Sequence, residues 1–274
     1  MIALVAAALL AAQPACAAPP GAAGLLDQPQ QIIVVGETHG TVEAPAAFLG
    51  IVCEAARRGP VTVGLEMPES DQALLDFVME ADDEATAARI LRGGDFGDPR
   101  RNDGRHSQAM FEMILGFWRL KAAGHDIALR PFAPRMAFIR GRSQGWWELE
   151  MGYRMSRPLV ERPEARLLIL VGDLHARKAG YGDRFGIGLP AAGHLHGGDT
   201  LTLHIARQGG QSWSCQPDCG VQQDPAAYDP DVRGVVLQPF DNGAYDGVLA
   251  VGPTTASPPV AEDQPSPISS GSSS

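Results

Sequence analysis

The sequence predicts an α/β fold: a mostly parallel mixed sheet with helices on both faces, and antiparallel strands added in the C-terminal part. Three observations support this. Short apolar runs rich in β-branched residues alternate with segments of helical periodicity. Three of the runs end alike, at a Gly with a carboxylate one or two residues later. After the third run the segments become shorter and alternate between apolar and polar residues.

The first half of the chain contains two of these runs. "QIIVVG" is apolar throughout, as expected for a strand buried on both faces, and "VTVGLEMP" is a second strand. Residues 44–58 are predicted as a helix between them, because Gly59-Pro60 is a typical stop signal. A further helix is predicted over residues 71–91, followed by the loop "GGDFGDPRRNDG".

The second half continues the alternation and then departs from it. Residues 107–123 place large apolar side chains at helical spacing, "HDIALRPF" is a strand, and residues 138–161 are predicted to be largely helical. "RLLILVG" is the third strongly apolar strand. "TLTLHIAR", "GVVLQPF" and "YDGVLAVG" are shorter strands, some of them expected to be antiparallel. A single domain over residues 24–257 is expected, followed by a disordered tail over residues 258–274 that has almost nothing to bury.

The first 17 residues are predicted to be an export signal. An apolar stretch too short to span a bilayer precedes Ala15-Cys16-Ala17, a pattern typical of signal-peptidase cleavage. The expected location is therefore periplasmic or secreted. The alternative is a lipoprotein modified at Cys16, and association with a membrane is expected only in that case.

Export implies an oxidising compartment, in which disulfides form. Cys215 and Cys219 flank a turn-like Gln-Pro-Asp and are predicted to be bonded to each other. A C-x3-C metal site is a competing interpretation, but no second pair is present to complete it. Cys53 lies among apolar residues and is predicted to be a buried free thiol.

The charge balance excludes one class of partner. Thirty-two acidic residues against 22 basic ones give a net charge of −10, and no basic stripe occurs. Nucleic acid is therefore not expected to bind, and a small-molecule ligand or substrate is. The oligomeric state is not predicted.

Carboxylates and histidines follow the three strongest strands. Glu37 and His39 follow the first, Glu66 the second, and Asp173 and His175 the third. The carboxyl ends of parallel strands meet at one edge of a sheet, where α/β proteins usually bind ligands. We therefore expect these side chains to line one cleft.

Two imidazoles and several carboxylates suit two kinds of chemistry. They are ordinary ligands of a divalent transition metal, with Glu37, His39, Glu66 and His175 as the expected set. They also perform acid–base catalysis without a metal. Neither a Gly-x-Ser-x-Gly motif nor a candidate nucleophilic Cys is present, so water is the expected nucleophile of a hydrolase.

Two residues are secondary candidates. Arg105 in "DGRHS" is a candidate anion clamp, although a solvated helix face explains it equally well. Glu148 in "WWELEMGYRM" is a polar residue among large apolar ones and either supports the site or is simply exposed. His125 is interpreted as structural, and His194, His196 and His204 rank below the strand-end histidines.

The strand-end residues resemble a superfamily that groups erythromycin esterases, the ChaN haem-binding lipoproteins and the TraB/Tiki proteins. The marks are Gly36-Glu37-Thr38-His39, Glu66 in "GLEMP" and Gly172-Asp173-Leu174-His175. Glu148-x-x-Met151 is similar to a helix motif of the esterase branch. The resemblance covers about residues 31–178. The esterase signature has one more residue between Glu and His than this chain has.

Two functions follow as hypotheses. The first is an exported hydrolase of an unknown ester or amide, in which His39 is the general base and Glu37 orients it. Glu66 and His175 would then hold a metal or stabilise the developing oxyanion. The second, which the resemblance to ChaN implies, is a non-catalytic protein that binds haem or iron in the same cleft.

Overall fold

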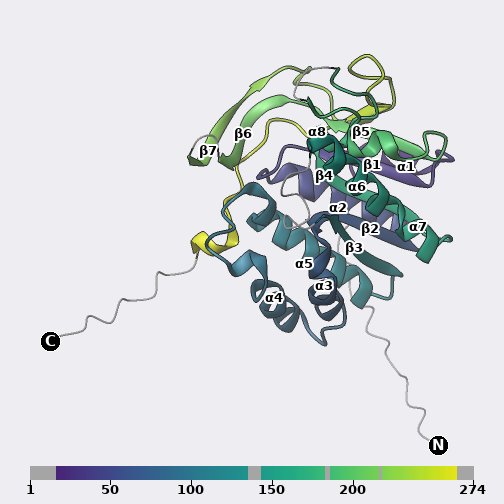
Figure 1. Cartoon of the computed structure of the whole chain (residues 1–274). Coiled ribbons are helices and arrows are strands. Elements are labelled where there is room, and N and C mark those ends of the chain that lie inside the picture. Colours follow the sequence, from purple (N-terminus) through teal and green to yellow (C-terminus); the bar gives the residue numbers. More distant parts are fainter. Residues whose placement is uncertain (1–16, 135–142, 183–185, 216–217, 264–274) are drawn as a thin grey trace, which may run out of the picture.

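The computed structural model describes residues 17–134, 143–182, 186–215 and 218–263, and it has the predicted α/β architecture (Figure 1). A seven-stranded sheet has the order β3-β2-β4-β1-β5-β9-β8. All neighbouring strands in it are parallel except β8, which is antiparallel to β9. The strands are β1 (Ile32–Glu37), β2 (Val61–Pro68), β3 (Ile127–Ala133), β4 (Arg166–Gly172), β5 (Thr200–Ile205), β8 (Gly234–Val236) and β9 (Gly247–Ala250).

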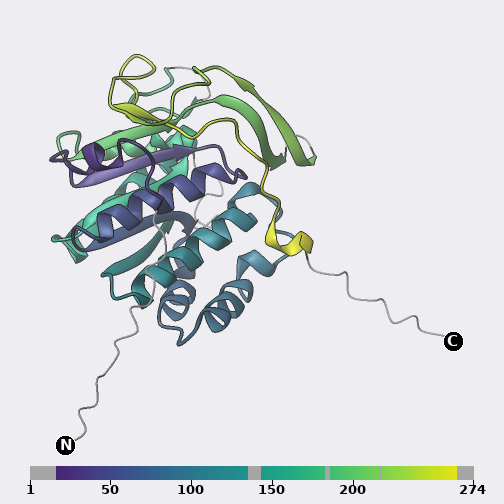
Figure 2. The same ribbon diagram turned by 180° about the vertical axis from the view of Figure 1, so that it is seen from behind.

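Helices cover both faces of this sheet (Figures 1 and 2). One face packs against α1 (Ala22–Leu26), α2 (Glu43–Ala56), α3 (Gln72–Met79), α4 (Glu84–Arg92) and α5 (Gln108–Ala122). The other packs against α6 (Gln144–Ser156), α7 (Pro158–Glu161) and α8 (Asp173–Ala176). Alternate residues of β1 enter opposite cores: Ile33 and Val35 join the first, Ile32 and Val34 the second. Burial on both faces explains why this strand is apolar throughout.

Two helical predictions need correction. Residues 71–91 form two helices instead of one, because Asp83 has an extended backbone and caps α4 by accepting a hydrogen bond from Thr86 N at 2.7 Å. In the predicted helix over residues 138–161, α6 begins only at Gln144, where Ser143 is the N-cap, and residues 138–142 lie outside the described residues.

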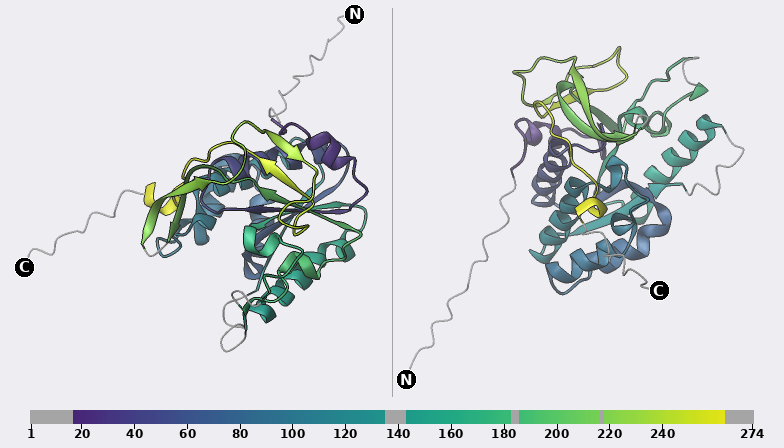
Figure 3. Two further views of the ribbon diagram at one scale, coloured as in Figure 1. Left: turned by 90° about the horizontal axis from the view of Figure 1, so that it is seen from above. Right: turned by 90° about the vertical axis from the view of Figure 1, so that its left-hand side faces the viewer.

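A hairpin beyond the main sheet was not predicted. β6 (Gln208–Cys215) and β7 (Cys219–Ala226) form an antiparallel pair that projects away from the sheet (Figures 1 and 3). The predicted disulfide between Cys215 and Cys219 closes its tip. The strands escape prediction because β7 is largely exposed and has no apolar run.

The C-terminal segment is ordered further than expected. The carbonyl of Pro258 accepts a hydrogen bond from Gln108 N at 2.9 Å, and Val260 is buried against the first core. The predicted disorder therefore does not begin at residue 258, and residues 264–274 lie outside the described part of the chain. No described helix has both the length and the apolar character needed to cross a bilayer.

The prediction of a free thiol at Cys53 is wrong. Cys53 is buried in α2 as expected, but it is disulfide-bonded. The N-terminal segment packs on this helix, since a Cβ added at Gly50 would lie 2.4 Å from the carbonyl oxygen of Ala17. Such packing of a distant segment onto a helix leaves no pattern in the sequence.

Thiol counting checks both disulfide results. We expect no reactive thiol from Cys53, Cys215 or Cys219 in the unreduced, denatured protein. The measurement is alkylation without reductant followed by peptide mass spectrometry. An alkylated Cys53 peptide in the unreduced sample would restore the original interpretation.

Candidate functional site

The three strand-end side chains expected to converge do meet at the carboxyl edge of the sheet. β4 lies between β2 and β1, so Glu66 and Glu37 approach the end of β4 from both sides. Nδ1 of His39 lies 3.0 Å from Oε1 of Glu37, and its Nε2 lies 3.4 Å from Oε2 of Glu66. Both carboxylate side chains are almost completely buried, whereas His39 is a quarter exposed. His39 is therefore held between two buried carboxylates.

Gly172, the last residue of β4, lies at the centre of this group. Its N–H donates to Oε2 of Glu66 at 2.7 Å. A Cβ added here would lie 2.9 Å from Nε2 of His39, 3.2 Å from Oε2 of Glu66 and 3.6 Å from Cδ2 of His175. All three side chains therefore occupy the space above Gly172, and only a glycine lets them meet.

His175 is oriented by Glu148. Its Nδ1 lies 2.8 Å from Oε2 of Glu148, a carboxylate that is fully buried. Glu148 also accepts hydrogen bonds from Ala191 N at 3.0 Å and from Nε2 of Gln144 at 2.7 Å. Glu148 thus supports the site, and the alternative that it is simply exposed is wrong. Its partner His175 is 27 residues further along the chain, so the pairing left no local signal.

Arg105 also points into this site. Its Nη1 donates to Oε1 of Glu66 at 3.3 Å, while Nε and Nη2 donate to Asp103. The residue lies in a short 3-10 turn (Gly104–His106) that precedes α5, so it does not belong to the polar stripe of that helix. The interpretation as a solvated helix face is therefore wrong.

Close backbone packing holds the two loops that carry His39 and Arg105. A Cβ at Gly104 would lie 2.4 Å from the backbone nitrogen of Gly40, and a Cβ at Gly40 would collide with the carbonyl of Trp213. Trp213, in the hairpin, donates its backbone N–H to Gly40 O at 2.8 Å and its indole N–H to Asn102 O at 2.8 Å. The hairpin thus fixes both loops.

Asp173 belongs to a neighbouring group instead. Its Oδ1 lies 2.5 Å from Nδ1 of His204 and accepts a hydrogen bond from the Tyr245 hydroxyl at 2.7 Å. His204 is almost fully buried on β5, beside β1. The sequence analysis ranked His204 low because alternation in "TLTLHIAR" gives equal weight to every second residue. The other low-ranked histidines do not join the site: His125 contacts Ala56 O, and His196 is mostly exposed.

The charges of the site are strongly coupled. Burial would lower the pKa of His39, but attraction to Glu66 and hydrogen bonds with Glu37 and Glu66 outweigh it and raise the pKa to about 10. Burial would raise the pKa of Glu66, yet the charges of His39, His175 and Arg105 hold it well below its usual range. Burial raises the pKa of Glu37 despite its contact with His39. Geometry agrees, because both ring nitrogens of His39 face carboxylate oxygens and fit an imidazolium that donates twice.

Stability should therefore depend on pH in the alkaline range. A raised pKa in the folded state means that the contribution of His39 is complete below its unfolded pKa of about 6.5 and is lost as pH rises through about 10. We expect the free energy of unfolding to fall between these limits, measured by urea denaturation at a series of pH values. The variant His39→Gln should show a flatter curve. Parallel curves would mean that the His39 imidazolium does not exist in the folded protein.

The arrangement does not fit the metal site expected from the sequence. Among the residues that the structure describes, no three His, Cys, Asp or Glu side chains form a group that could hold a metal ion. Both nitrogens of His39 face carboxylates, and Oε2 of Glu66 already accepts from Gly172. Their lone pairs are directed at each other instead of at a common point, so we derive no step that uses a metal.

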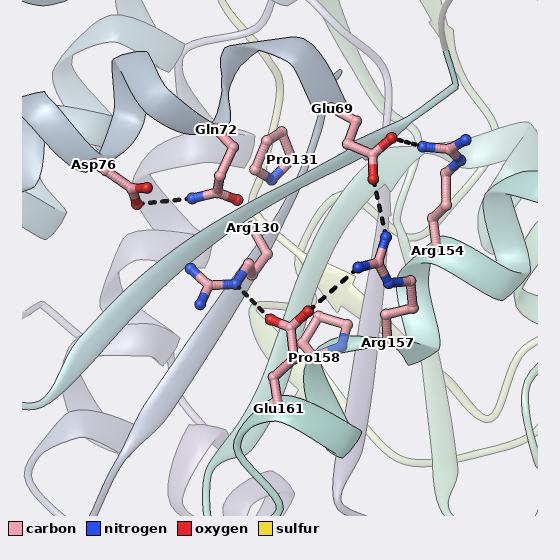
Figure 4. A pocket seen from close by; sticks show the side chains of 9 residues that line it. All are labelled: Glu69, Gln72, Asp76, Arg130, Pro131, Arg154, Arg157, Pro158 and Glu161. Atoms are coloured by element: carbon pink, nitrogen blue, oxygen red, sulfur yellow. Dashed lines mark hydrogen bonds and ion pairs between the residues drawn. The ribbon is translucent and has the colours of Figure 1, made fainter.

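An ion-pair network ties α6 to the end of β2. Glu69, just after β2, lies between Arg154 and Arg157 of α6, and Arg157 Nη1 donates to it at 3.0 Å (Figure 4). Glu161 of α7 extends the network to Arg130 of β3, with an Nε–Oε2 distance of 3.0 Å. The network borders a polar cavity of about 310 Å³. Because α6 carries Glu148 and β2 carries Glu66, these contacts hold the two halves of the site together.

Solved structures share this fold at low sequence identity. A mutant of the erythromycin esterase EreC in its open conformation matches with a TM-score of 0.62 and 11% identity, over 84% of this chain and 92% of that one. The chain shares the fold of an erythromycin esterase. A protein from Bacillus cereus matches with a TM-score of 0.60 and 10% identity over 86% and 91% of the two chains. A succinoglycan biosynthesis protein matches with a TM-score of 0.53 and 9% identity over 84% and 89%.

The sequence comparisons add no assignment. No family model matches the chain, and no curated protein matches it significantly. At about 10% identity the structural likeness establishes the erythromycin-esterase-like fold, as the strand-end motifs predicted, and leaves the chemistry to the site itself.

Proposed function

We propose that the chain is an exported hydrolase that activates water for attack on an ester or amide of a small molecule. One observation carries the proposal: two carboxylate–histidine pairs, Glu37–His39 and Glu148–His175, meet over Gly172 with Glu66 between them. A buried carboxylate that fixes the tautomer of a histidine is a recurring arrangement for proton transfer in hydrolysis. The esterase-like fold supports it.

The general base in this proposal is His175. Glu148 accepts the proton of Nδ1, which leaves Nε2 as the proton acceptor of a neutral ring. None of the described residues hydrogen-bonds Nε2, and the side chain is 15% exposed, so water can reach it. His39, by contrast, is an imidazolium near neutral pH and cannot accept a proton. We therefore exchange the roles that the strand-end motifs suggested for the two histidines.

The remaining steps follow from the charges. His175 removes a proton from water, and the hydroxide adds to the carbonyl carbon of the substrate. Arg105 and the His39 imidazolium stabilise the negative charge that develops on the carbonyl oxygen. When the carbon–oxygen or carbon–nitrogen bond breaks, protonated His175 returns its proton to the leaving group. The products are an acid and an alcohol or amine. Glu66 keeps Arg105 and His39 charged and in place.

A purified sample tests the proposal against the alternative of a non-catalytic haem- or iron-binding protein. We expect hydrolysis of members of a panel of alkyl and aryl esters at neutral pH, and no Soret shift on haem titration. A Soret band at one haem per chain, without hydrolysis of any ester or amide, would favour the binding protein. Elemental analysis of protein purified without chelator checks for bound iron in the same experiment.

A further inference from the structure

We infer that the cavity beside Asp173 is a substrate subsite that binds a flat aromatic ring carrying a carboxylate; this rests on the proposed hydrolase function. The cavity has a volume of about 470 Å³, enough for a substituted benzene ring. It adjoins the proposed base, because Asp173 and His175 lie two residues apart in the single turn of α8. A group bound there is attached to a bond that lies near His175.

Aromatic side chains form the walls of this cavity. Tyr181, Tyr228, Phe240 and Tyr245 line it together with His204. The ring of His204 is stacked on Phe240 with centroids 5.1 Å apart and planes within 8°, and it lies 5.2 Å from the ring of Tyr245. These contacts make a rigid surface that favours a planar, apolar ring.

Two arginines supply the charge preference. Arg177 lies over the ring of Tyr181 at 4.5 Å and pairs with Asp241 through Nη1, but no described residue accepts a hydrogen bond from its Nη2. Arg207 is 58% exposed, and its nearest carboxylate oxygen, on Asp173, is 3.6 Å away, too far for a hydrogen bond. Both guanidinium groups therefore keep donors for a ligand.

The negative groups of the cavity do not cancel this preference. Asp173 already accepts from Tyr245 and pairs with His204, and Asp241 pairs with Arg177. The chain as a whole carries a net charge of −10, so a carboxylate has no general attraction to this protein and needs a local cationic site. Arginine binds a carboxylate through two parallel hydrogen bonds, which gives orientation as well as affinity.

Binding of a matched ligand pair tests the subsite without requiring turnover. The probes are 4-hydroxybenzoate and its neutral methyl ester, titrated into the full-length protein by calorimetry. We expect the carboxylate to bind about 10- to 100-fold more tightly, the range for one lost charge-assisted hydrogen-bond pair. Arg207→Gln should abolish that preference, and Arg207→Lys, which keeps the charge but not the two parallel donors, should retain part of it.

Arg57→Gln is the control, since it removes the same charge at the end of α2, away from the carboxyl edge, and should leave the preference unchanged. Equal binding of the two probes to the wild-type protein, or an unchanged preference in Arg207→Gln, would overturn the subsite. Turnover is scored separately with 4-acetoxybenzoate and its methyl ester. Selective binding without hydrolysis would refute the proposed function while the subsite stands.

Discussion

Replacement of His175 by Asn should reduce the rate of ester hydrolysis by about 100- to 10,000-fold, the usual loss when a general base is removed. Asn keeps a polar group of similar reach beside Glu148 but cannot take up a proton. The fold should persist, because His175 lies at the strand edge and is not part of either core. The measurement is kcat/KM on the best ester of the panel, with circular dichroism to confirm folding.

The matched control is His196→Asn, at a histidine whose side chain is 79% exposed and whose carboxylate partner is Asp199. It should hydrolyse the ester at the wild-type rate. If His175→Asn retains activity and His39→Asn loses it, the base is His39, as the strand-end motif first suggested. If both are fully active, the site over Gly172 does not catalyse hydrolysis.

Gly172→Ala should lower activity by about 100-fold although it touches no proposed catalytic atom of the wild-type protein. The added methyl would lie 2.9 Å from Nε2 of His39 and 3.2 Å from Oε2 of Glu66, so both side chains must move. A displacement of about 1 Å in an active site is enough for a loss of that size. The backbone of Gly172, with φ of −55° and ψ of 140°, is one that Ala adopts without strain.

Gly59→Ala is the control for this variant, because a Cβ there meets nothing within 4 Å. We expect both variants to melt close to the wild-type temperature and only Gly172→Ala to lose kcat/KM. A pH profile adds a second measurement, since displacement of Glu66 should lower the pKa of His39. Full activity in Gly172→Ala would show that the three side chains need not meet over Gly172 during catalysis.

The parallel sheet and the meeting of its strand-end side chains were predictable from the sequence. Apolar strands buried on both faces are visible as unbroken runs, and parallel strands bring their carboxyl ends to one edge. Glu37, His39 and Glu66 therefore followed from position alone.

The partners that fix the protons did not follow. Glu148 reaches His175 from a helix on the other side of the chain order, and His204 reaches Asp173 from a strand 31 residues further on. Both contacts depend on tertiary packing, which leaves no periodicity. The protonation of His39 was missed for the same reason, because it requires knowing that Glu66 lies 3.4 Å from Nε2.

The hairpin β6–β7 has a practical consequence for anyone who produces this protein. The Cys215–Cys219 bond closes the tip of the strand pair whose Trp213 supports the loops of His39 and Arg105. Expression in a reducing cytosol would leave that tip open and Cys53 unbonded. Material from such a host would carry the correct mass and sequence with a loosened site. Assays and screens should therefore begin with protein folded under oxidising conditions.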